Sequence, residues 1–195
     1  MCYNTKISRE AAEIQIWAAI GFPLASEFKP ANQISGFSFP KTPVITNELD
    51  EIQLLHWGVF PYNNKERPNL LNARVETLEE KRSFKDICNN RCLIIVDGFY
   101  EWKQLGKQKI KHEIGFKNQL FALAGIFSTK ENYKSYAIIT TEAKGIMRTI
   151  HNTKLRMPIA FNSKEKMNDW LHGKNEVGDY DFTYVSDSYQ EELFL

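Results

Sequence analysis

The chain has 195 residues and a mass of 22.7 kDa; 43% of its residues are apolar and 25% are charged. This length suits one domain, and the composition provides enough apolar surface for a packed core, which excludes the disordered and collagen-like classes. The 25 basic and 24 acidic residues leave a net charge of +1, so a nucleic-acid-binding surface has to be a local patch.

The sequence lacks the long apolar segments that a membrane span or a signal peptide requires. No apolar run approaches the roughly 18 residues of a membrane helix. The first residues of the chain are interrupted by charged side chains, namely Lys6, Arg9, Glu10 and Glu13. We therefore expect a cytoplasmic protein with no membrane partner.

The three cysteines, an odd count, argue against a disulfide framework. Cys88 and Cys92 are close in sequence, but no second pair or histidine cluster completes a zinc site. The sequence therefore predicts no metal, and it predicts both side chains as small buried hydrophobic groups.

A helix is predicted over residues 8–20, with Ser8 as its N-cap and residues 21–23 (Gly-Phe-Pro) as its end. The apolar residues that recur at helical spacing are Ala12, Ile16, Trp17 and Ile20. Residues 23–50 are rich in Pro, Asn, Ser and Thr, and they predict a long loop with short extended pieces.

The next segments alternate between strand, loop and helix. Residues 52–59 predict a strand, and residues 61–68 predict a polar, turn-rich loop. Thr77 and Glu80 have the spacing of a capping box, which predicts a helix through Ile87.

Strand patterns dominate the second half of the chain. They are found at residues 92–96, 99–103, 111–116, 120–128, 136–141 and 157–161. Residues 163–171 predict a short helix with Trp170 and Leu171 facing the core. The sum is an α+β fold: a single domain over residues 1–195, with a curved, mostly antiparallel β-sheet or open barrel and peripheral helices.

Cys2 is the first candidate for chemistry, because the initiator methionine is generally removed when the second residue is small. Its α-amine and thiol, with reference pKa values of ~8 and ~8.5, both have an appreciable nucleophilic fraction near neutral pH. Such an aminothiol captures aldehydes, because the amine forms an imine and the thiol then closes a five-membered thiazolidine ring. An incidental cysteine at a chain terminus is the competing interpretation.

Three further blocks follow Cys2 along the chain. They are residues 72–77 (Asn-Ala-Arg-Val-Glu-Thr), residues 97–103 (Asp-Gly-Phe-Tyr-Glu-Trp-Lys), and Ile150-His151 together with residues 156–158 (Arg-Met-Pro). In order and spacing, the set resembles the signature of the SOS-response-associated peptidase (SRAP) family of abasic-site DNA-protein crosslinking proteins. The resemblance runs from Cys2 to about Ser186.

The resemblance implies a protein that binds single-stranded DNA containing abasic sites and links Cys2 covalently to the ring-opened sugar. It also implies autoproteolytic removal of the residue before Cys2 and a weak lyase activity. Asn72 would orient the amino terminus and the sugar, Glu101 would act as acid and base, and His151 would help to open the sugar. No cofactor is implied, and we expect a monomer that is cytoplasmic and associated with the nucleoid when bound to DNA.

The same residues also have a local interpretation. Glu101 follows an apolar strand and lies between Tyr100 and Trp102, an environment that raises a carboxyl pKa by desolvation and suits a proton carrier. Taken alone, His151 could be a hydrogen-bonded structural histidine and Asn72 a turn residue.

The basic residues have two interpretations. Arg74, Arg82 and Arg156 stand where the family has phosphate-contacting residues, and guanidinium groups suit phosphate oxygens; the alternative is surface ion pairing. The lysines of one predicted hairpin could attract a DNA backbone or simply face solvent: Lys103, Lys107, Lys109, Lys111 and Lys117. Trp57 is predicted as a core residue rather than a base-stacking platform.

Two positions depart from the family pattern. The family usually begins Met-Cys-Gly-Arg, whereas Tyr3 and Asn4 follow Cys2 here, so we expect altered DNA contacts around the terminus. The family loop that carries an aromatic pair against the bases here offers Tyr62 followed by two asparagines. Tyr62 is therefore the candidate wedge.

Two other functions stay open at this point. One is an N-terminal-cysteine peptidase or amidohydrolase, which would need an oxyanion hole that the sequence does not identify. The other is a single-strand nucleic-acid-binding module without chemistry.

Overall fold

The structure is a computed structural model of the whole chain, and it describes residues 2–60, 70–117, 119–130, 133–175 and 178–187. Its centre is a barrel in which each strand is hydrogen-bonded to the next. The strands, in order around the barrel, are β10 (Tyr133–Glu142), β4 (Ile52–Trp57), β3 (Lys41–Thr46), β6 (Arg91–Val96) and β9 (Phe121–Lys130). The ring closes because β9 also pairs with β10, with Phe127 opposite Tyr136.

The apolar strand β6 shows why the barrel has a core on both sides. All six of its residues are buried. Cys92 and Ile94 belong to the cluster inside the barrel, whereas Leu93 packs with the outer cluster around Trp170. Because both faces of β6 are buried, its sequence is a continuous apolar run rather than an alternation of apolar and polar residues.

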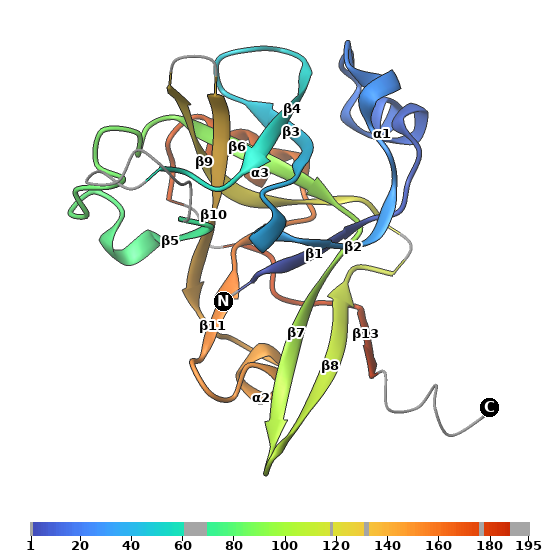
Figure 1. Cartoon of the computed structure of the whole chain (residues 1–195), viewed down its shortest axis with the longest axis vertical. Coiled ribbons are helices and arrows are strands. Elements are labelled where there is room, and N and C mark those ends of the chain that lie inside the picture. Colours follow the sequence, from blue (N-terminus) through green and yellow to red (C-terminus); the bar gives the residue numbers. More distant parts are fainter. Residues whose placement is uncertain (1, 61–69, 118, 131–132, 176–177, 188–195) are drawn as a thin grey trace.

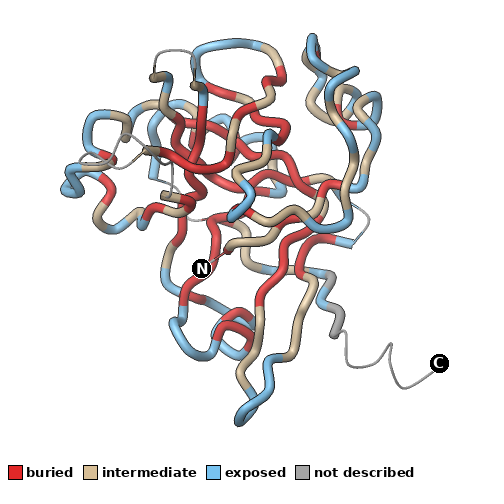
Figure 2. Tube along the Cα trace, viewed as in Figure 1, coloured by how far each residue is buried: buried red, intermediate tan, exposed pale blue. Residues whose placement is uncertain are grey.

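A second sheet lies beside the barrel (Figure 1). Its order is β13 (Tyr184–Asp187), β8 (Gln108–Gly115), β7 (Gly98–Leu105), β1 (Asn4–Ile7) and β2 (Ala31–Ser35). The β7–β8 hairpin extends from the body of the molecule, and its far end is exposed while the barrel interior is buried (Figure 2). Strand β1 pairs with β7, which brings the first residues of the chain against the 97–103 block.

Short elements attach to the two sheets. Strands β5 (Asn72–Arg74) and β11 (Arg156–Pro158) both pair with β10. Strand β10 therefore brings the sequence blocks 72–77 and 156–158 close together. The remaining elements are α1 (Ala11–Ala18), η1 (Ala25–Glu27), η2 (Gly36–Ser38), η3 (Val75–Thr77), α2 (Met147–Ile150), β12 (Ala160–Phe161) and α3 (Lys164–Leu171).

The predicted class, an α+β domain built on a curved, mostly antiparallel sheet with peripheral helices, is confirmed, and the barrel is closed rather than open. Within α3, Trp170 is buried and its indole N–H donates to the Cys92 carbonyl oxygen at 2.9 Å, whereas Leu171 is half-buried. None of the described helices is long and apolar enough to cross a membrane.

The predicted helix over residues 77–87 is wrong. The segment forms η3 and then a series of turns, in which the Phe84 amide donates to Lys81 and the Ile87 amide to Phe84, three residues back. Only Leu78 and Phe84 of this segment are buried. Two anchoring side chains do not supply the packed face that stabilises a helix of this length.

Three other expectations need correction. Helix α1 begins at Ala11 rather than Ser8, and it buries Ile14 while Ile16 is 82% exposed. The predicted loop 23–50 contains β3, which is a central strand of the barrel because it pairs with β4 on one side and with β6 on the other. Cys88 is half-buried, and only Cys92 of the predicted buried pair is fully buried.

Candidate active site

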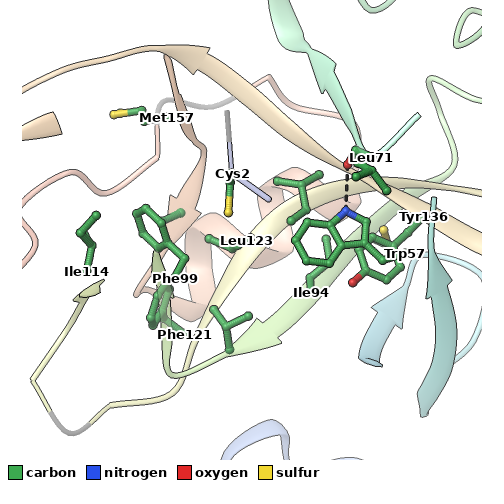
Figure 3. Packing of buried hydrophobic residues seen from close by; sticks show 14 of the residues in the cluster. Cys2, Trp57, Leu71, Ile94, Phe99, Ile114, Phe121, Leu123, Tyr136 and Met157 are labelled. Carbon is green, nitrogen blue, oxygen red and sulfur yellow. Dashed lines mark hydrogen bonds between the residues drawn. The ribbon is translucent and has the colours of Figure 1, made fainter. Parts of the chain in front are cut away.

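Cys2 lies in the molecular interior, immediately before β1. Its side chain is fully buried in the cluster that includes Phe99, Leu123 and Met157 (Figure 3). The Sγ atom donates a long hydrogen bond of 3.7 Å to the Asn4 carbonyl oxygen. Burial, with a smaller contribution from the nearby Glu101 charge, raises the pKa of the thiol far above its usual range. The thiol is therefore protonated at neutral pH and needs a proton acceptor to react.

Glu101 and His151 are a buried acid-base pair. Glu101 stands in β7, and His151 caps the carboxyl end of α2. The Glu101 Oε2 atom and the His151 Nε2 atom are 3.8 Å apart, and both side chains are buried. The fold thus brings together two residues that lie 50 positions apart in the sequence.

Burial makes both members of the pair favour their neutral forms. Desolvation raises the pKa of Glu101 to about 7, so the carboxyl group is close to half-protonated at neutral pH. Desolvation also lowers the pKa of His151, even though its bond to the Arg156 backbone acts in the opposite direction. A proton can therefore be taken up or released here near pH 7.

The orientation of His151 is set by Arg156. The His151 Nδ1 atom lies 2.6 Å from the Arg156 carbonyl oxygen and 3.1 Å from the Arg156 amide nitrogen, so the Arg156 backbone holds the ring whether Nδ1 donates or accepts. In the tautomer in which Nδ1 donates to the carbonyl oxygen, Nε2, which faces Glu101, is the basic nitrogen of the neutral ring.

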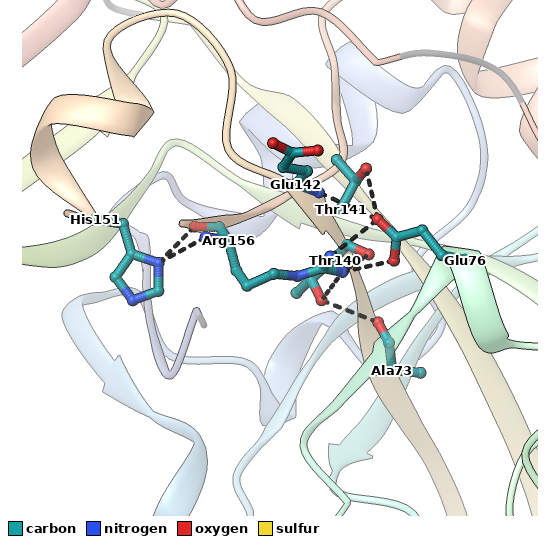
Figure 4. A network of polar contacts seen from close by, with 7 residues as sticks. All are labelled: Ala73, Glu76, Thr140, Thr141, Glu142, His151 and Arg156. Carbon is teal, nitrogen blue, oxygen red and sulfur yellow. Dashed lines mark hydrogen bonds and ion pairs between the residues drawn. The ribbon is translucent and has the colours of Figure 1, made fainter. Parts of the chain in front are cut away.

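Arg156 is itself fixed by Glu76 (Figure 4). Its Nη1 and Nη2 atoms donate to the two carboxylate oxygens of Glu76 at 2.9 and 2.8 Å, and Nη2 also donates to the Thr140 carbonyl oxygen at 2.8 Å. Although burial opposes it, the Arg156 hydrogen bonds hold the pKa of Glu76 at about 2. A chain of contacts thus runs from Glu76 through Arg156 and His151 to Glu101.

A cleft of about 410 Å³ opens onto this pair. Glu101 and His151 line it, together with Tyr3, Asn4, Phe37, Trp102, Gln104, Lys109, Thr153 and Lys154. The β7–β8 hairpin and the segment after α2 therefore form its walls. Cys2 is not among the described residues that line the cleft, but the Glu101 charge acts on its buried thiol, so the thiol lies behind the pair. A buried thiol near a proton-carrying pair is suited to nucleophilic chemistry.

A family model described as SOS response associated peptidase (SRAP) matches residues 1–194. The chain belongs to the SRAP family.

Curated members of the SRAP family include close relatives of the chain. The abasic site processing protein YoqW of Bacillus subtilis is 36% identical over 165 residues, which cover 79% of this chain and 72% of that protein. The abasic site processing protein HMCES of Xenopus tropicalis is 27% identical, over 60% of this chain and 44% of that protein.

Solved structures share the SRAP-like fold. A protein from Bacteroides thetaiotaomicron aligns with a TM-score of 0.82 at 26% identity, over 95% of this chain and 90% of that one. A protein from Bordetella bronchiseptica aligns with a TM-score of 0.78 at 17% identity, which shows the fold alone.

Asn72 of the SRAP block 72–77 lies at the start of β5, beside Leu71, which packs in the same cluster as Cys2. It is not among the residues that line the cleft. Both polar atoms of its side-chain amide are buried and have no hydrogen-bond partner within the described part of the chain. Such atoms cost about 1–3 kcal/mol each when unsatisfied. The role of Asn72 in orienting the amino terminus and the sugar stays a prediction.

The structure does not support Arg156 as a phosphate contact. Its side chain is 10% exposed, and both terminal nitrogens are engaged within the protein. Arg156 instead positions His151. Sequence reasoning missed its partner Glu76, although the acidic Glu76 in block 72–77 and the basic Arg156 in block 156–158 offered a signal for a pair.

The other basic residues lie at the surface. Arg74 ends β5 and is exposed, and Arg82 is exposed in the turns after η3. On the hairpin, Lys109 lines the cleft, while the Lys111 ammonium lies 4.0 Å from the centre of the Tyr100 ring. The exposed Lys107 and Lys117 and the half-buried Lys103 complete the set.

Two aromatic candidates have different outcomes. Trp57 is fully buried and its indole N–H donates to the Leu71 carbonyl oxygen at 2.9 Å, which confirms it as a core residue. Tyr62, the candidate wedge, lies outside the described residues.

Proposed function

We propose that this protein captures abasic sites in single-stranded DNA by a covalent bond between Cys2 and the ring-opened sugar. The observation that carries the proposal is the buried pair of Glu101 and His151, 3.8 Å apart, with a Glu101 pKa of about 7 and a Glu101 charge that acts on the Cys2 thiol. The curated relatives named as abasic site processing proteins support the same substrate.

The reaction needs a free α-amine on Cys2. Hydrolysis of the Met1–Cys2 peptide bond supplies it, by the same site or by a methionine aminopeptidase. The amine and the thiol then stand on adjacent carbons, so the second bond forms within one molecule and is favoured by proximity.

The sugar has to open before it can be captured. In the closed form, C1 carries a hydroxyl group and is bonded to the ring oxygen. The His151 Nε2 atom accepts the hydroxyl proton while an acid protonates the ring oxygen, which breaks the ring bond and leaves an aldehyde at C1. The protonated form of Glu101 suits the acid role, and His151 then returns the hydroxyl proton to the Glu101 carboxylate, 3.8 Å away, so that both residues regain their starting forms.

Two bonds then form at the aldehyde carbon. The amine nitrogen attacks C1, one amine proton moves to the oxygen, and the acid form of Glu101 protonates the resulting hydroxyl group, which leaves as water and gives a protonated imine. The Cys2 sulfur next attacks the imine carbon, and the thiol proton passes to the Glu101 carboxylate, while the nitrogen keeps its remaining proton. The thiazolidine that results retains every atom except the water, and Glu101 returns to its starting form.

DNA binding is assigned to the exposed basic residues. Arg74, Arg82 and the hairpin lysine Lys109 are exposed at the surface, where phosphate oxygens can approach, whereas the Arg156 side chain is buried in its pair with Glu76. Backbone contacts of this kind hold any sequence and weaken with salt.

Incubation of the protein with single-stranded DNA that carries one abasic site, followed by a denaturing gel, tests the proposal. A heat-stable band of protein plus DNA is expected, and the intact mass of the unreacted protein should lack one methionine. A variant that keeps an additional residue before Cys2 should form no adduct. Binding without any adduct would favour the non-chemical DNA-binding module, and cleavage of peptide substrates without an adduct would favour the peptidase.

A further inference from the structure

The mouth of the cleft carries an aromatic pair that the proposed chemistry does not use. Tyr3 and Phe37 line the cleft with Glu101 and His151. Their ring centroids lie 5.0 Å apart with an angle of 35° between the planes. Phe37 is 63% exposed, although phenylalanine has no polar atom that gains from water. The pair therefore offers apolar ring surface to the occupant of the cleft.

The core holds this pair in place. The Gly36 amide donates to the Tyr3 carbonyl oxygen at 2.9 Å, and the Phe39 amide closes the η2 turn on the Gly36 carbonyl oxygen at 3.0 Å. A Cβ atom on Gly36 would lie only 3.0 Å from the ring of the buried Trp57, so the turn rests directly on the core. Phe37 is exposed on a fixed support rather than on a loose loop.

The surroundings of the pair suit a polyanion that carries planar groups. Lys109 and Lys154 line the same cleft and supply positive charge. Aromatic surface beside basic side chains is the combination that binds single-stranded nucleic acid, in which the rings stack on bases and the cations face phosphates.

An abasic residue creates a specific need for such a surface. The base next to the missing one has lost a stacking neighbour on that side, and an aromatic side chain can replace it. Tyr3 directly follows Cys2 in the chain. A sugar held at Cys2 therefore places the neighbouring nucleotide at the rim that Tyr3 and Phe37 form.

We propose that Tyr3 and Phe37 form a stacking site for the nucleobase that adjoins the abasic residue. The site rests on the proposed function, since that function locates the abasic sugar at Cys2. Every base has a π-face, so the site adds affinity and positioning without reading sequence. It also gives Tyr3 a role at a position where the family pattern has glycine.

The test uses two single-stranded oligonucleotides with a tetrahydrofuran residue, which cannot open and therefore cannot crosslink. In the first, adenines flank the tetrahydrofuran; in the second, the flanking nucleotides are also tetrahydrofuran. Phe37→Ala should weaken binding to the first oligonucleotide by about tenfold and leave binding to the second unchanged.

Matched variants separate the effect of ring stacking from that of side-chain volume. Phe37→Trp should bind the first oligonucleotide as tightly as the wild-type protein, and Phe37→Leu, which keeps apolar volume without a π-face, should bind it as weakly as Phe37→Ala. Ile16→Ala removes another highly exposed apolar side chain, on α1 and outside the cleft, and should change neither affinity. Because Phe37→Leu preserves volume, a folding defect in Phe37→Ala does not obscure the result.

Equal losses on both oligonucleotides, or no loss on either, would overturn the stacking site. The adduct assay on natural abasic DNA tests the proposed function separately. If the wild-type protein forms no adduct but Phe37→Ala binds the first oligonucleotide more weakly, the covalent chemistry is excluded and the stacking site stands. If the wild-type protein forms the adduct but Phe37→Ala binds both oligonucleotides normally, the stacking site is excluded and the covalent chemistry stands.

Discussion

The inner end of the cleft and its rim are built on different physical principles. At the inner end, Glu101 and His151 are buried, and the Glu76–Arg156 pair fixes the histidine from behind. At the rim, Phe37 and Lys109 are exposed, and their charge and ring surface face solvent. Desolvation controls proton affinity at the inner end, while long-range attraction and stacking act at the rim.

This difference separates two arginines that look alike in the sequence. Arg74 and Arg156 both stand in signature blocks, yet one is exposed and the other is paired inside the protein. Residues of the inner end should therefore affect rate and stability, and residues of the rim should affect affinity and its salt dependence.

The largest effect is expected from Cys2→Ala. The variant keeps the α-amine and loses the thiol, so it can form an imine but cannot close the thiazolidine. The yield of stable adduct on a denaturing gel should fall by roughly 100-fold or more, because the intramolecular ring closure is lost. Borohydride should still trap the imine. A stable adduct at wild-type yield would exclude the thiazolidine.

Glu101→Gln should have the next largest effect. It keeps size and hydrogen bonding but cannot carry a proton, and positioned acid-base groups contribute ~100- to 10,000-fold, so crosslinking should slow by at least about tenfold. Affinity for undamaged single-stranded DNA should stay unchanged, because Glu101 is not assigned to phosphate. Glu142→Gln, at an exposed position on β10, is the matched control and should crosslink normally.

The same variant also reports on desolvation through stability. The folded state raises the Glu101 pKa from 4.5 to about 7, so the wild-type protein binds more protons when folded and loses stability as the pH rises between these values. Above pH 7, Glu101→Gln should therefore be more stable by on the order of 3 kcal/mol, since one pKa unit corresponds to about 1.4 kcal/mol. Below pH 4 the two proteins should unfold alike in urea; a constant difference at all pH values would contradict the raised pKa.

Arg156→Met should affect stability and rate together. It leaves Glu76 without its partner and frees the segment that orients His151. Because Glu76 is 42% exposed and can be solvated, we expect a loss of only about 2 kcal/mol in urea unfolding. Crosslinking should slow, while the salt dependence of DNA binding should stay as in the wild type. A reduced salt slope would return Arg156 to the DNA surface.

Arg74→Ala should have the smallest effect and the opposite profile. Loss of one phosphate contact should lower the slope of log affinity against log salt by about 1, with little change in stability. The rate of crosslinking at saturating DNA should match the wild type. An unchanged slope would assign Arg74 to the structure of the η3 turn rather than to DNA.

The individual strands were more predictable from the sequence than the closure of the barrel. The apolar runs at residues 92–96 and 120–128 identify β6 and β9, because a strand buried on both faces needs such a run. The pairing of β9 with β10 that closes the barrel depends on register between strands, which no local pattern encodes. The helix predicted from Thr77 and Glu80 failed because a cap signal does not supply a buried face.

The candidate site was predictable where chemistry fixes the residue type. Cys2, Glu101 and His151 carry groups that the proposed reaction needs. The structure brings Glu101 and His151 together, and their catalytic roles stay predictions. The role of Arg156 was not predictable, because an arginine fits a phosphate and a carboxylate equally well. Burial and the position of Glu76 decide between the two, and both arise from the pairing of β5 and β11 with β10.

The pairing of β1 with β7 also has a consequence for the newly made chain. Asn4 lies opposite Tyr100 and, on the other side of β1, opposite Ser35, so β1 can pair with β2 long before β7 has been synthesised. Pairing between segments as far apart as β1 and β7 slows folding, because a long loop has to close first. The proposed nucleophile is thus synthesised about a hundred residues before its proposed proton carrier, and the two meet only when β7 has joined the sheet.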